Sequence, residues 1–474
     1  MTVPRDLNRL FHPQSVAVLG ASANPAAIGG QPIAHLQNHG FAGSIYPVNP
    51  KYPEVAGLTC YPSLADTPTV PDVVIVAIAA QHVEAGIKAA GEKGIPFAIV
   101  FSAGYAESGE KGAQRQAALY ETARAAGVTL VGPNCQGLMN ISVPLHMGFG
   151  APYALTYRKG GFALTSQSGA FGNSLVMDLN DRGIGFARYI STGNEADLSS
   201  IDCLNAFLDM DDVTAIGAYV EGFKDLDRFE ALAQRAHSLG KPIVLWKVGN
   251  SPAGALAAQA HTANLSKSSD FAPDQFRALG VIDVQDARDM AICLKALEAR
   301  RRPAGPKVGV VSVSGGAGIF IADRCCERGL DVGTLSQNTV ARMRPHLPEF
   351  ASLRNPVDVT GSAVNAPESL AESLSAVSQD SAVDSLILAL AAVTGTGARL
   401  AAEEIARIQD ISPKPVVVCW NGPRSMAQDA YDIFEAAGVP VFKSPSDAVR
   451  AVEAMCIFAG IPLSPHPNHG ALVR

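Results

Sequence analysis

The sequence predicts an α/β protein made of three consecutive Rossmann-like or flavodoxin-like domains with parallel sheets. Short β-branched runs alternate with helical patterns along almost all of the 474 residues. The predicted strands are apolar on both faces, which is typical of parallel sheets covered by helices on each side. The series also restarts twice, each time with an apolar strand that runs into a small-residue turn and then a helix.

Residues 1–150 are expected to form the first domain. Two helical patterns in it, 80–94 and 110–127, each end on glycine, the usual residue after a helix C-terminus. Glycine and proline bound its strand-like runs, which are 15–20, 72–79, 96–104 and 128–133.

The second domain is expected at 151–305 and the third at 306–460, followed by an irregular tail at 461–474. The run "GGFALTSQSGAFGNSLV" opens the second domain, and "GFARYIST", "TAIGAYVEG" and "KPIVLWKVG" continue it. A basic joint, "EARRRPAGP", leads to "KVGVVSVSGGAGIFIAD", which opens the third domain. The runs "NPVDVTG", "VDSLILALAAV" and "KPVVVCWNG" then supply further strands.

Composition excludes several classes of protein. The formal charge of −7, with 17% charged residues, argues against a nucleic-acid binder, which needs a basic face. The eight cysteines form no CxxC pair and read as buried thiols in a reducing compartment. The first residues lack the apolar core of a signal peptide, and no apolar run approaches the ~20 residues that span a bilayer. We therefore expect a cytoplasmic protein with no membrane partner.

Two of the three opening turns have the composition of oxyanion sites. Helix N-termini expose backbone N–H groups, and small residues let an anion approach them. Tight packing of strand against helix would also select small residues, so each turn alone supports either interpretation. The candidate phosphate-binding residues are Ser166, Gln167, Ser168 and Gly169 in the first of these turns, and Ser314, Gly315, Gly316 and Gly318 in the second.

The turn "GASANPAAIGG" differs from the dinucleotide fingerprint G-x-G-x-x-G because Ser22 replaces the middle glycine. The next strand ends in Asn49, Pro50 and Lys51, without the acidic residue that would bind a ribose diol. These features disfavour a nicotinamide cofactor. A nucleotide with a phosphate near Lys51, such as coenzyme A, fits better.

One histidine, His261, lies among small residues in "LAAQAHTANL". A neutral imidazole is a competent nucleophile and a reversible phosphoryl carrier near neutral pH. The other nine histidines show no metal-ligand spacing, so no metal site is expected in the chain.

An ordered set of motifs gives the chain a family resemblance. These motifs include "SVAVLGASANP", "IYPVNPKYPEVAGLTCYPSL", "FSAGYAESGEKG", "VGPNCQGLMN", "STGNEADLSSID", "AYVEGFKD" and "VPVFKSPSDAVRAVEAM". In this order they resemble the NDP-forming acyl-CoA synthetases, also called ADP-forming acetate–CoA ligases, and in particular their CoA-binding alpha-type portion. The alpha subunit of succinyl-CoA synthetase is a more distant likeness.

The resemblance implies an acid–thiol ligase that makes acyl-CoA through an acyl phosphate, with phosphate passed by a histidine to or from ADP or GDP. His261 takes the place of the phosphorylated histidine, and Glu221 that of the carboxylate that orients it. The resemblance assigns CoA contacts to Gly20, Ser22, Asn49, Lys51, Ser102 and Asn134.

Several residues depart from the family pattern. Ala260 and Ala263 replace the usual serine and glycine beside the histidine, and Lys267 replaces a smaller residue. Ala27 replaces a lysine common in the first turn. These changes suggest an uncommon substrate or, in the extreme case, lost phosphoryl transfer.

Three Rossmann-like domains leave no room for the ATP-grasp domain that binds the nucleotide in this family. We therefore expect a separate ATP-grasp beta-type subunit, which supplies ATP or ADP with Mg²⁺, in a heterotetramer. Two alternatives stay open: a CoA-dependent acyl or carbamoyl transferase that uses no nucleotide, and a CoA-sensing protein with a decayed site.

Overall fold

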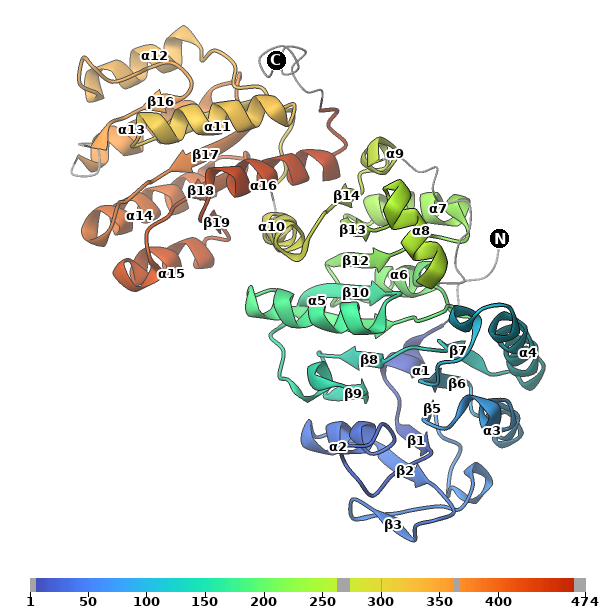
Figure 1. Ribbon diagram of the computed structural model, residues 1–474. Helices are drawn as coiled ribbons and strands as arrows, with labels where there is room; N and C mark the ends of the chain where they lie inside the picture. Colours follow the sequence, from blue (N-terminus) through green and yellow to red (C-terminus); the bar gives the residue numbers. More distant parts are fainter. Residues whose placement is uncertain (1–5, 262–272, 300, 362–365, 464–474) are drawn as a thin grey trace. The chain divides into compact units, whose positions relative to one another are not determined.

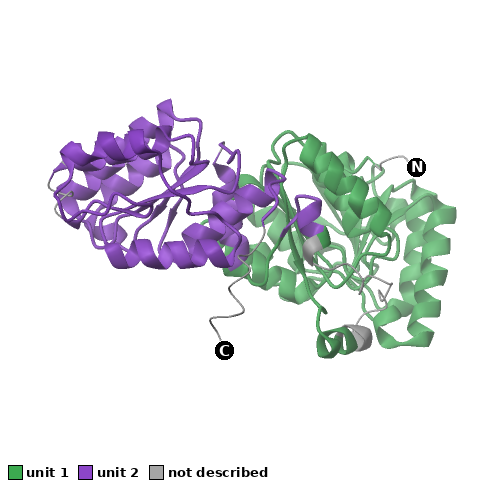
Figure 2. Ribbon diagram, turned by 90° about the horizontal axis from the view of Figure 1, so that it is seen from above, with its two compact units in different colours: residues 1–275, 283–288 green, residues 276–282, 289–474 purple. Residues whose placement is uncertain are grey.

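The computed structural model describes residues 6–261, 273–299, 301–361 and 366–463. The chain divides into two compact units (Figure 2). The first contains residues 1–275 and 283–288, and the second contains 276–282 and 289–474.

The first sheet, in the first unit, is a parallel sheet with strand order β2-β1-β5-β6-β7. Helix α2 lies on one face, and α3 and α4 lie on the other (Figure 1). Helices α3 and α4 are followed directly by Gly94 and Gly127, whose φ angles of 83° and 69° favour glycine. The elements of this part are α1 (Asn8–Phe11), β1 (Ser15–Leu19), α2 (Gln31–Asn38), β2 (Ser44–Val48), β3 (Glu54–Val55), β4 (Leu58–Thr59), β5 (Val73–Val76), α3 (Ala80–Lys93), β6 (Phe97–Val100), α4 (Glu110–Ala126) and β7 (Thr129–Val131).

The second sheet has strand order β14-β13-β12-β10-β11-β8-β9. Its β8 and β9 are antiparallel and extend an otherwise parallel pattern beyond β11, which the sequence did not predict. Helix α5 lies on one face, opposite α6 and α7 (Figure 1). The elements are β8 (Gly137–Asn140), β9 (Leu145–Gly148), β10 (Lys159–Ser166), α5 (Gly169–Asp181), β11 (Phe186–Ser191), α6 (Ser200–Leu208), β12 (Ala215–Val220), α7 (Leu226–Ser238), β13 (Ile243–Lys247), α8 (Pro252–His261), α9 (Pro273–Ala278), β14 (Ile282–Asp283) and α10 (Ala287–Glu298).

The third sheet, in the second unit, is parallel with order β16-β15-β17-β18-β19. Its two faces carry separate apolar clusters, one formed with α13, α14 and α15 and the other with α11 and α16. The elements are β15 (Val308–Ser312), α11 (Gly315–Glu327), α12 (Gln337–Met343), β16 (Val357–Asp358), α13 (Pro367–Gln379), β17 (Ser385–Ala389), α14 (Gly395–Ile411), β18 (Val416–Cys419), α15 (Gln428–Ala436), β19 (Val441–Phe442) and α16 (Pro445–Phe458).

These sheets confirm the predicted α/β class with mostly parallel strands. The predicted runs 15–20, 72–79, 96–104 and 128–133 contain β1, β5, β6 and β7. The expected boundaries near 150 and 305 stay predictions. Within the described ranges, no helix is both long and apolar enough to cross a bilayer.

A histidine cluster lies where α2 meets β9 in the first unit. The rings of His39 and His146 stack with centroids 3.6 Å apart, and a ring nitrogen of each contacts the carbonyl oxygen of Tyr153, at 2.9 and 3.0 Å. Burial, with the adjacent His39, lowers the pKa of His146 to about 4.

A buried ion network fixes α16 within the second unit. Glu453 is 2% exposed and accepts hydrogen bonds from Arg450, at 2.8 Å, and from Arg328. Arg450 also donates to Asp289 on α10 at 2.7 Å.

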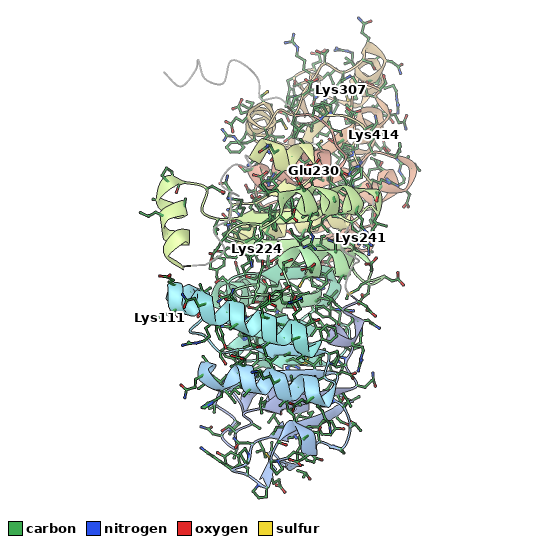
Figure 3. All side chains as sticks on the ribbon, turned by 90° about the vertical axis from the view of Figure 1, so that its right-hand side faces the viewer. Lys111, Lys224, Glu230, Lys241, Lys307 and Lys414 are labelled. Carbon is green, nitrogen blue, oxygen red and sulfur yellow. The ribbon has the colours of Figure 1, made fainter. Side chains whose placement is uncertain are left out.

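In the first unit, the ammonium group of Lys241 binds a backbone carbonyl. It donates to Leu208 O at 2.9 Å (Figure 3).

Candidate functional site

The carboxyl edge of the first sheet has the topology of a ligand site. Strand β1 lies between β2 and β5, so the chain reverses its direction of winding there, and open α/β sheets bind ligands at such points. Gly20 follows β1 with φ 90°, and a Cβ on it would collide with the carbonyl of Ala77. A Cβ on Gly29 would likewise collide with the Gly20 carbonyl, so the turn folds back on itself closely.

Hydrogen bonds join the strand ends at this edge. Asn49, after β2, donates from Nδ2 to Ala21 O at 2.7 Å. The Ser102 hydroxyl, after β6, donates to Ile78 O at 2.5 Å. The backbone N–H of Asn134, after β7, donates to Ser102 O at 3.0 Å.

Thus the structure brings Gly20, Asn49, Ser102 and Asn134 to one edge of one sheet. The other two predicted CoA residues lie in the loops of the same edge. Ser22 accepts a hydrogen bond from the Asn24 N–H at 3.2 Å, and Lys51 is exposed beside Asn49.

The turn between β10 and α5 is built around two serines. Ser166 is fully buried, and its hydroxyl donates to Ser168 O at 2.7 Å. The Ser168 hydroxyl caps α5 by accepting from the Phe171 N–H at 3.3 Å. A Cβ on Gly172 would collide with the Ser166 hydroxyl, so the helix can lie this close to the strand because that residue is glycine.

Gln167, the second residue of this turn, faces the loop after β12. Its Oε1 accepts from the Glu221 N–H at 2.8 Å and from the Gly222 N–H at 3.4 Å. Its Nε2 donates to Gly222 O at 2.8 Å, and its own N–H donates to Tyr219 O at 3.1 Å. Gln167 therefore fixes the backbone at Glu221 beside the Ser166–Gly169 turn.

Aromatic rings pack together near the end of β12. Tyr219 lies on β12, two residues before Glu221, which follows the strand. Burial raises the pKa of Tyr219, and the charge of Glu221 raises it further. Phe171 and Trp246 pack on the Tyr219 ring with centroid distances of 4.5 and 5.4 Å.

The turn between β15 and α11, in the second unit, is more open. The Ser312 hydroxyl donates to Ser314 O at 2.6 Å. A Cβ on Gly316 would have no neighbour within 4 Å, whereas one on Gly315 would lie 2.9 Å from Asp358 Oδ2. A Cβ on Gly318 would lie 3.1 Å from Pro356 Cβ, so that glycine allows close packing.

A cavity of about 600 Å³ opens beside this turn. Its walls come from the segments that follow β15, β17 and β18, so it lies at the carboxyl edge of the third sheet. The residues that line it are Ser314, Ala317, Ala389, Ala391, Ala392, Thr394, Cys419, Asn421, Gly422, Pro423, Met426 and Pro445.

His261 is the last residue of α8. Its side chain and residues 262–272, which contain Ala263 and Lys267, lie outside the described part of the chain. The sequence-predicted residues of the first unit therefore form two groups, the edge of the first sheet and the Ser166–Gly169 turn with Glu221.

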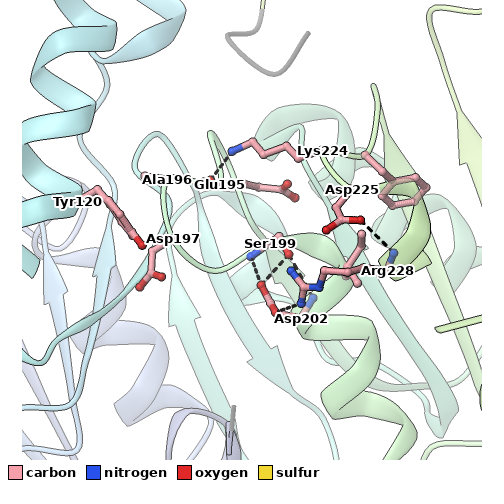
Figure 4. A pocket seen from close by; sticks show the side chains of 11 residues that line it. Tyr120, Glu195, Ala196, Asp197, Ser199, Asp202, Lys224, Asp225 and Arg228 are labelled. Carbon is pink, nitrogen blue, oxygen red and sulfur yellow. Dashed lines mark hydrogen bonds and ion pairs between the residues drawn. The ribbon is translucent and has the colours of Figure 1, made fainter. Parts of the chain in front are cut away.

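Sequence reasoning missed a polar cavity of about 190 Å³ in the first unit (Figure 4). Glu195 is 4% exposed in its wall, and burial raises the pKa of its carboxyl group although Ser200, Lys224 and Thr192 oppose the shift. Lys224 donates to Glu195 O at 2.6 Å, and Arg228 pairs with Asp202 at 2.6 Å. The motif "STGNEADLSSID" contains this wall, but its letters alone assign no partner to each residue.

Three family models match the chain in order. They are a CoA binding domain at 14–141, a succinyl-CoA ligase like flavodoxin domain at 159–297 and a ligase-CoA domain at 308–455. The chain is 32% identical to subunit alpha of acetate–CoA ligase [ADP-forming] II from Pyrococcus furiosus, over 95% of this chain and 97% of that subunit. The chain belongs to the NDP-forming acyl-CoA synthetase family.

Other members of the family are longer than this chain. Acetate–CoA ligase [ADP-forming] I from Archaeoglobus fulgidus is 34% identical over 95% of this chain, which spans 63% of that relative. Trans-feruloyl-CoA synthase, from an unknown prokaryotic organism, is 31% identical, and the chain spans 64% of it.

A solved structure of the family shares the fold. The dinucleotide forming acetyl-coenzyme A synthetase 1 of Ca. Korarchaeum cryptofilum, in complex with phosphate and ADP, has a TM-score of 0.85 at 30% identity. The match covers 96% of this chain and 97% of that chain.

Proposed function

We propose that this protein is the CoA-binding, phosphohistidine-bearing alpha-type subunit of an ADP-forming acyl-CoA synthetase. The overall reaction converts a carboxylic acid, CoA and ATP into acyl-CoA, ADP and phosphate. Two alpha subunits from P. furiosus support the alpha-type assignment, because the chain matches 97% of each at 32% identity. The name alpha implies a separate partner subunit, to which we assign the ATP-grasp fold and ATP with Mg²⁺. We propose that the two subunits form a heterotetramer in the cytoplasm.

His261 passes the phosphoryl group between the two subunits. A neutral ring nitrogen forms a bond to phosphorus as the bond from phosphorus to the ADP oxygen breaks. A carboxylate oxygen of the acid then attacks phosphorus, the N–P bond breaks, and an acyl phosphate forms. The CoA sulfur next bonds to the carbonyl carbon, phosphate leaves, and the thiol proton passes to solvent.

Glu221 orients the imidazole by accepting a hydrogen bond from one ring nitrogen, which leaves the other free to attack. The observation that carries the proposal is the clamp formed by Gln167. It holds Glu221 beside the Ser166–Gly169 turn, where the N-terminus of the 13-residue helix α5 exposes amides suited to a phosphoryl group.

The Ser314–Gly318 turn supplies a second set of amides at the start of α11, which is also 13 residues long. Gly20, Ser22, Asn49, Lys51, Ser102 and Asn134 bind CoA at the edge of the first sheet. Lys51, exposed there, supplies positive charge for a CoA phosphate. We assign the Mg²⁺ to the nucleotide on the partner subunit.

The test separates acyl transfer from phosphoryl transfer. The wild-type chain alone should exchange CoA and phosphate on an acyl group, and ATP-dependent synthesis should need the ATP-grasp partner. His261→Ala should keep the exchange but lose all ATP-dependent synthesis. Undiminished synthesis in His261→Ala would contradict the proposal. Exchange by the wild-type chain with no ATP-dependent synthesis when the ATP-grasp partner is present would favour the acyl or carbamoyl transferase. CoA binding without either activity would favour a sensor.

A further inference from the structure

A short segment of the first unit touches both groups of candidate residues. It runs from the end of β11 to the start of α6, over residues 192–199. At its beginning the Thr192 N–H donates to Ser166 O at 2.8 Å, and the Thr192 hydroxyl lies 3.3 Å from the same oxygen. The segment therefore begins against the last residue of β10, where the proposed phosphate turn starts.

The rest of the segment lies along the turn after β7. The Asn194 N–H donates to Pro133 O at 3.0 Å, and the Ala196 N–H donates to Gly132 O at 3.0 Å. Gly193 has φ 57°, and a Cβ on it would collide with Pro133 O. Thr192, which contacts Ser166, is therefore only two positions before Asn194, whose N–H contacts the residue next to Asn134.

The side chain of Asn194 extends this connection. It is 7% exposed. Its Oδ1 accepts from Asn134 Nδ2 at 3.3 Å, while its Nδ2 donates to Glu107 Oε2 at 2.5 Å and to Gln116 Oε1 at 2.9 Å. Both N–H donors and the oxygen acceptor of the Asn194 amide are thus used. These three bonds fix the orientation of the carboxamide.

Glu107 completes the arrangement. Its Oε1 accepts from the N–H groups of Gly104 and Tyr105, at 2.6 and 3.1 Å, in the loop that follows Ser102. Burial raises the pKa of Glu107, but these bonds and the one from Asn194 outweigh it, so the net shift is downward. Glu107 therefore stays an anionic acceptor, which an amide donor matches.

We propose that Asn194 is a positioning residue, which fixes Asn134 at the CoA edge relative to the Ser166–Gly169 turn. The inference rests on the proposed function. Attack of the CoA sulfur on an acyl phosphate needs the two reacting atoms about 3–3.5 Å apart, and a misplacement of about 1 Å can cost on the order of 100-fold in rate. Asn194 acts on that distance through Asn134 and Thr192, and it takes no part in transfer to the histidine.

The test compares two reactions of one acyl phosphate, acetyl or benzoyl phosphate. The first is CoA-dependent formation of acyl-CoA, and the second is phosphorylation of the chain without CoA. Asn194→Ala should lower kcat/KM for CoA in the first by about 10- to 100-fold and leave the second within about twofold. Asn205→Ala is the control, because that half-buried asparagine on α6 contacts neither edge and should leave both reactions unchanged.

A double variant tests the orientation of the amide. Asn194→Asp sets a second carboxylate against Glu107 and should lower CoA-dependent transfer at least as much as alanine does. Adding Glu107→Gln restores the hydrogen bond with its direction reversed, because the new amide at position 107 donates and the new carboxylate at position 194 accepts. The double variant should recover at least half of the lost kcat/KM.

Four results would overturn the inference. Equal losses in both reactions would mean a folding defect and overturn the inference, as would unchanged transfer in Asn194→Ala or no recovery in the double variant. A wild-type chain that forms no acyl-CoA would overturn the proposed function and this inference with it.

Discussion

Replacing Gln167 with alanine should both destabilise the first unit and displace Glu221. The substitution removes the donor to Gly222 O and the acceptor for the N–H groups of Glu221 and Gly222. Gln167 is 6% exposed, so water does not readily replace it. A buried polar group left without its partner costs about 1–3 kcal/mol, so the three backbone groups left here, at about 1 kcal/mol each, give an expected loss of about 3 kcal/mol.

The two tryptophans allow this loss to be measured in one unit. Trp246 lies in the first unit and Trp420 in the second, so in a Trp420→Phe background the remaining fluorescence reports on the first unit. Urea unfolding of Gln167→Ala should then show a lowered midpoint. Gln234→Ala serves as the control, because its side chain makes an exposed contact with Glu230 and should change stability by about 0.5 kcal/mol or less.

The same variant should accumulate less phosphate on His261, because Glu221 is no longer held at the turn. Equal unfolding midpoints for the Gln167 and Gln234 variants would refute the structural argument. A lowered midpoint with an unchanged phosphorylation rate would confirm that the Gln167 hydrogen bonds stabilise the unit, but it would contradict their role in placing Glu221.

Three further predictions concern other parts of the chain. Glu453→Ala should lower the free energy of unfolding of the second unit by about 3 kcal/mol, measured by Trp420 fluorescence, because it removes the buried ion-pair partner of Arg450. The control Glu403→Ala removes an exposed ion pair and should lower that free energy by less than about 0.5 kcal/mol. The pKa of His146 is about 4 in the folded chain and near its ordinary 6.5 in the unfolded chain, so the unfolded chain binds a proton first as the pH falls. The free energy of unfolding should therefore fall by about 3 kcal/mol between pH 6.5 and pH 4. In His146→Gln, the free energy of unfolding should depend less on pH over the same range. Gly316→Ala should leave the urea midpoint unchanged or raise stability by about 0.5–1 kcal/mol, yet slow phosphoryl transfer; an unchanged rate would argue against amide binding of phosphate there.

The strands of the first sheet were predictable because their β-branched runs are continuous and bounded by glycine or proline, as in β1 and β5. Strands β8 and β9 were missed, since "GLMN" and "LHMG" are four residues long and lack β-branched residues. They are strands because they pair with each other and with β11, which is a tertiary effect.

The candidate site, like the strands, was predictable from the sequence only in part. The small-residue turns were visible in the sequence, and family resemblance marked Glu221. The partner of Gln167 was not visible, because its side chain reaches Glu221 and Gly222, 54 and 55 residues away. Asn194 gave no signal of its own, since its role depends on groups from 60 to 87 residues away that only the fold brings together.

The most direct measurement of the central claim is the site of phosphorylation. The chain, with its ATP-grasp partner, Mg²⁺ and ATP, can be analysed by intact mass and by fragmentation that preserves N–P bonds. We predict one acid-labile phosphoryl group per chain, located on His261 and lost in His261→Ala. A phosphoryl group on another residue, or none while acyl-CoA is still made from ATP, would contradict the account.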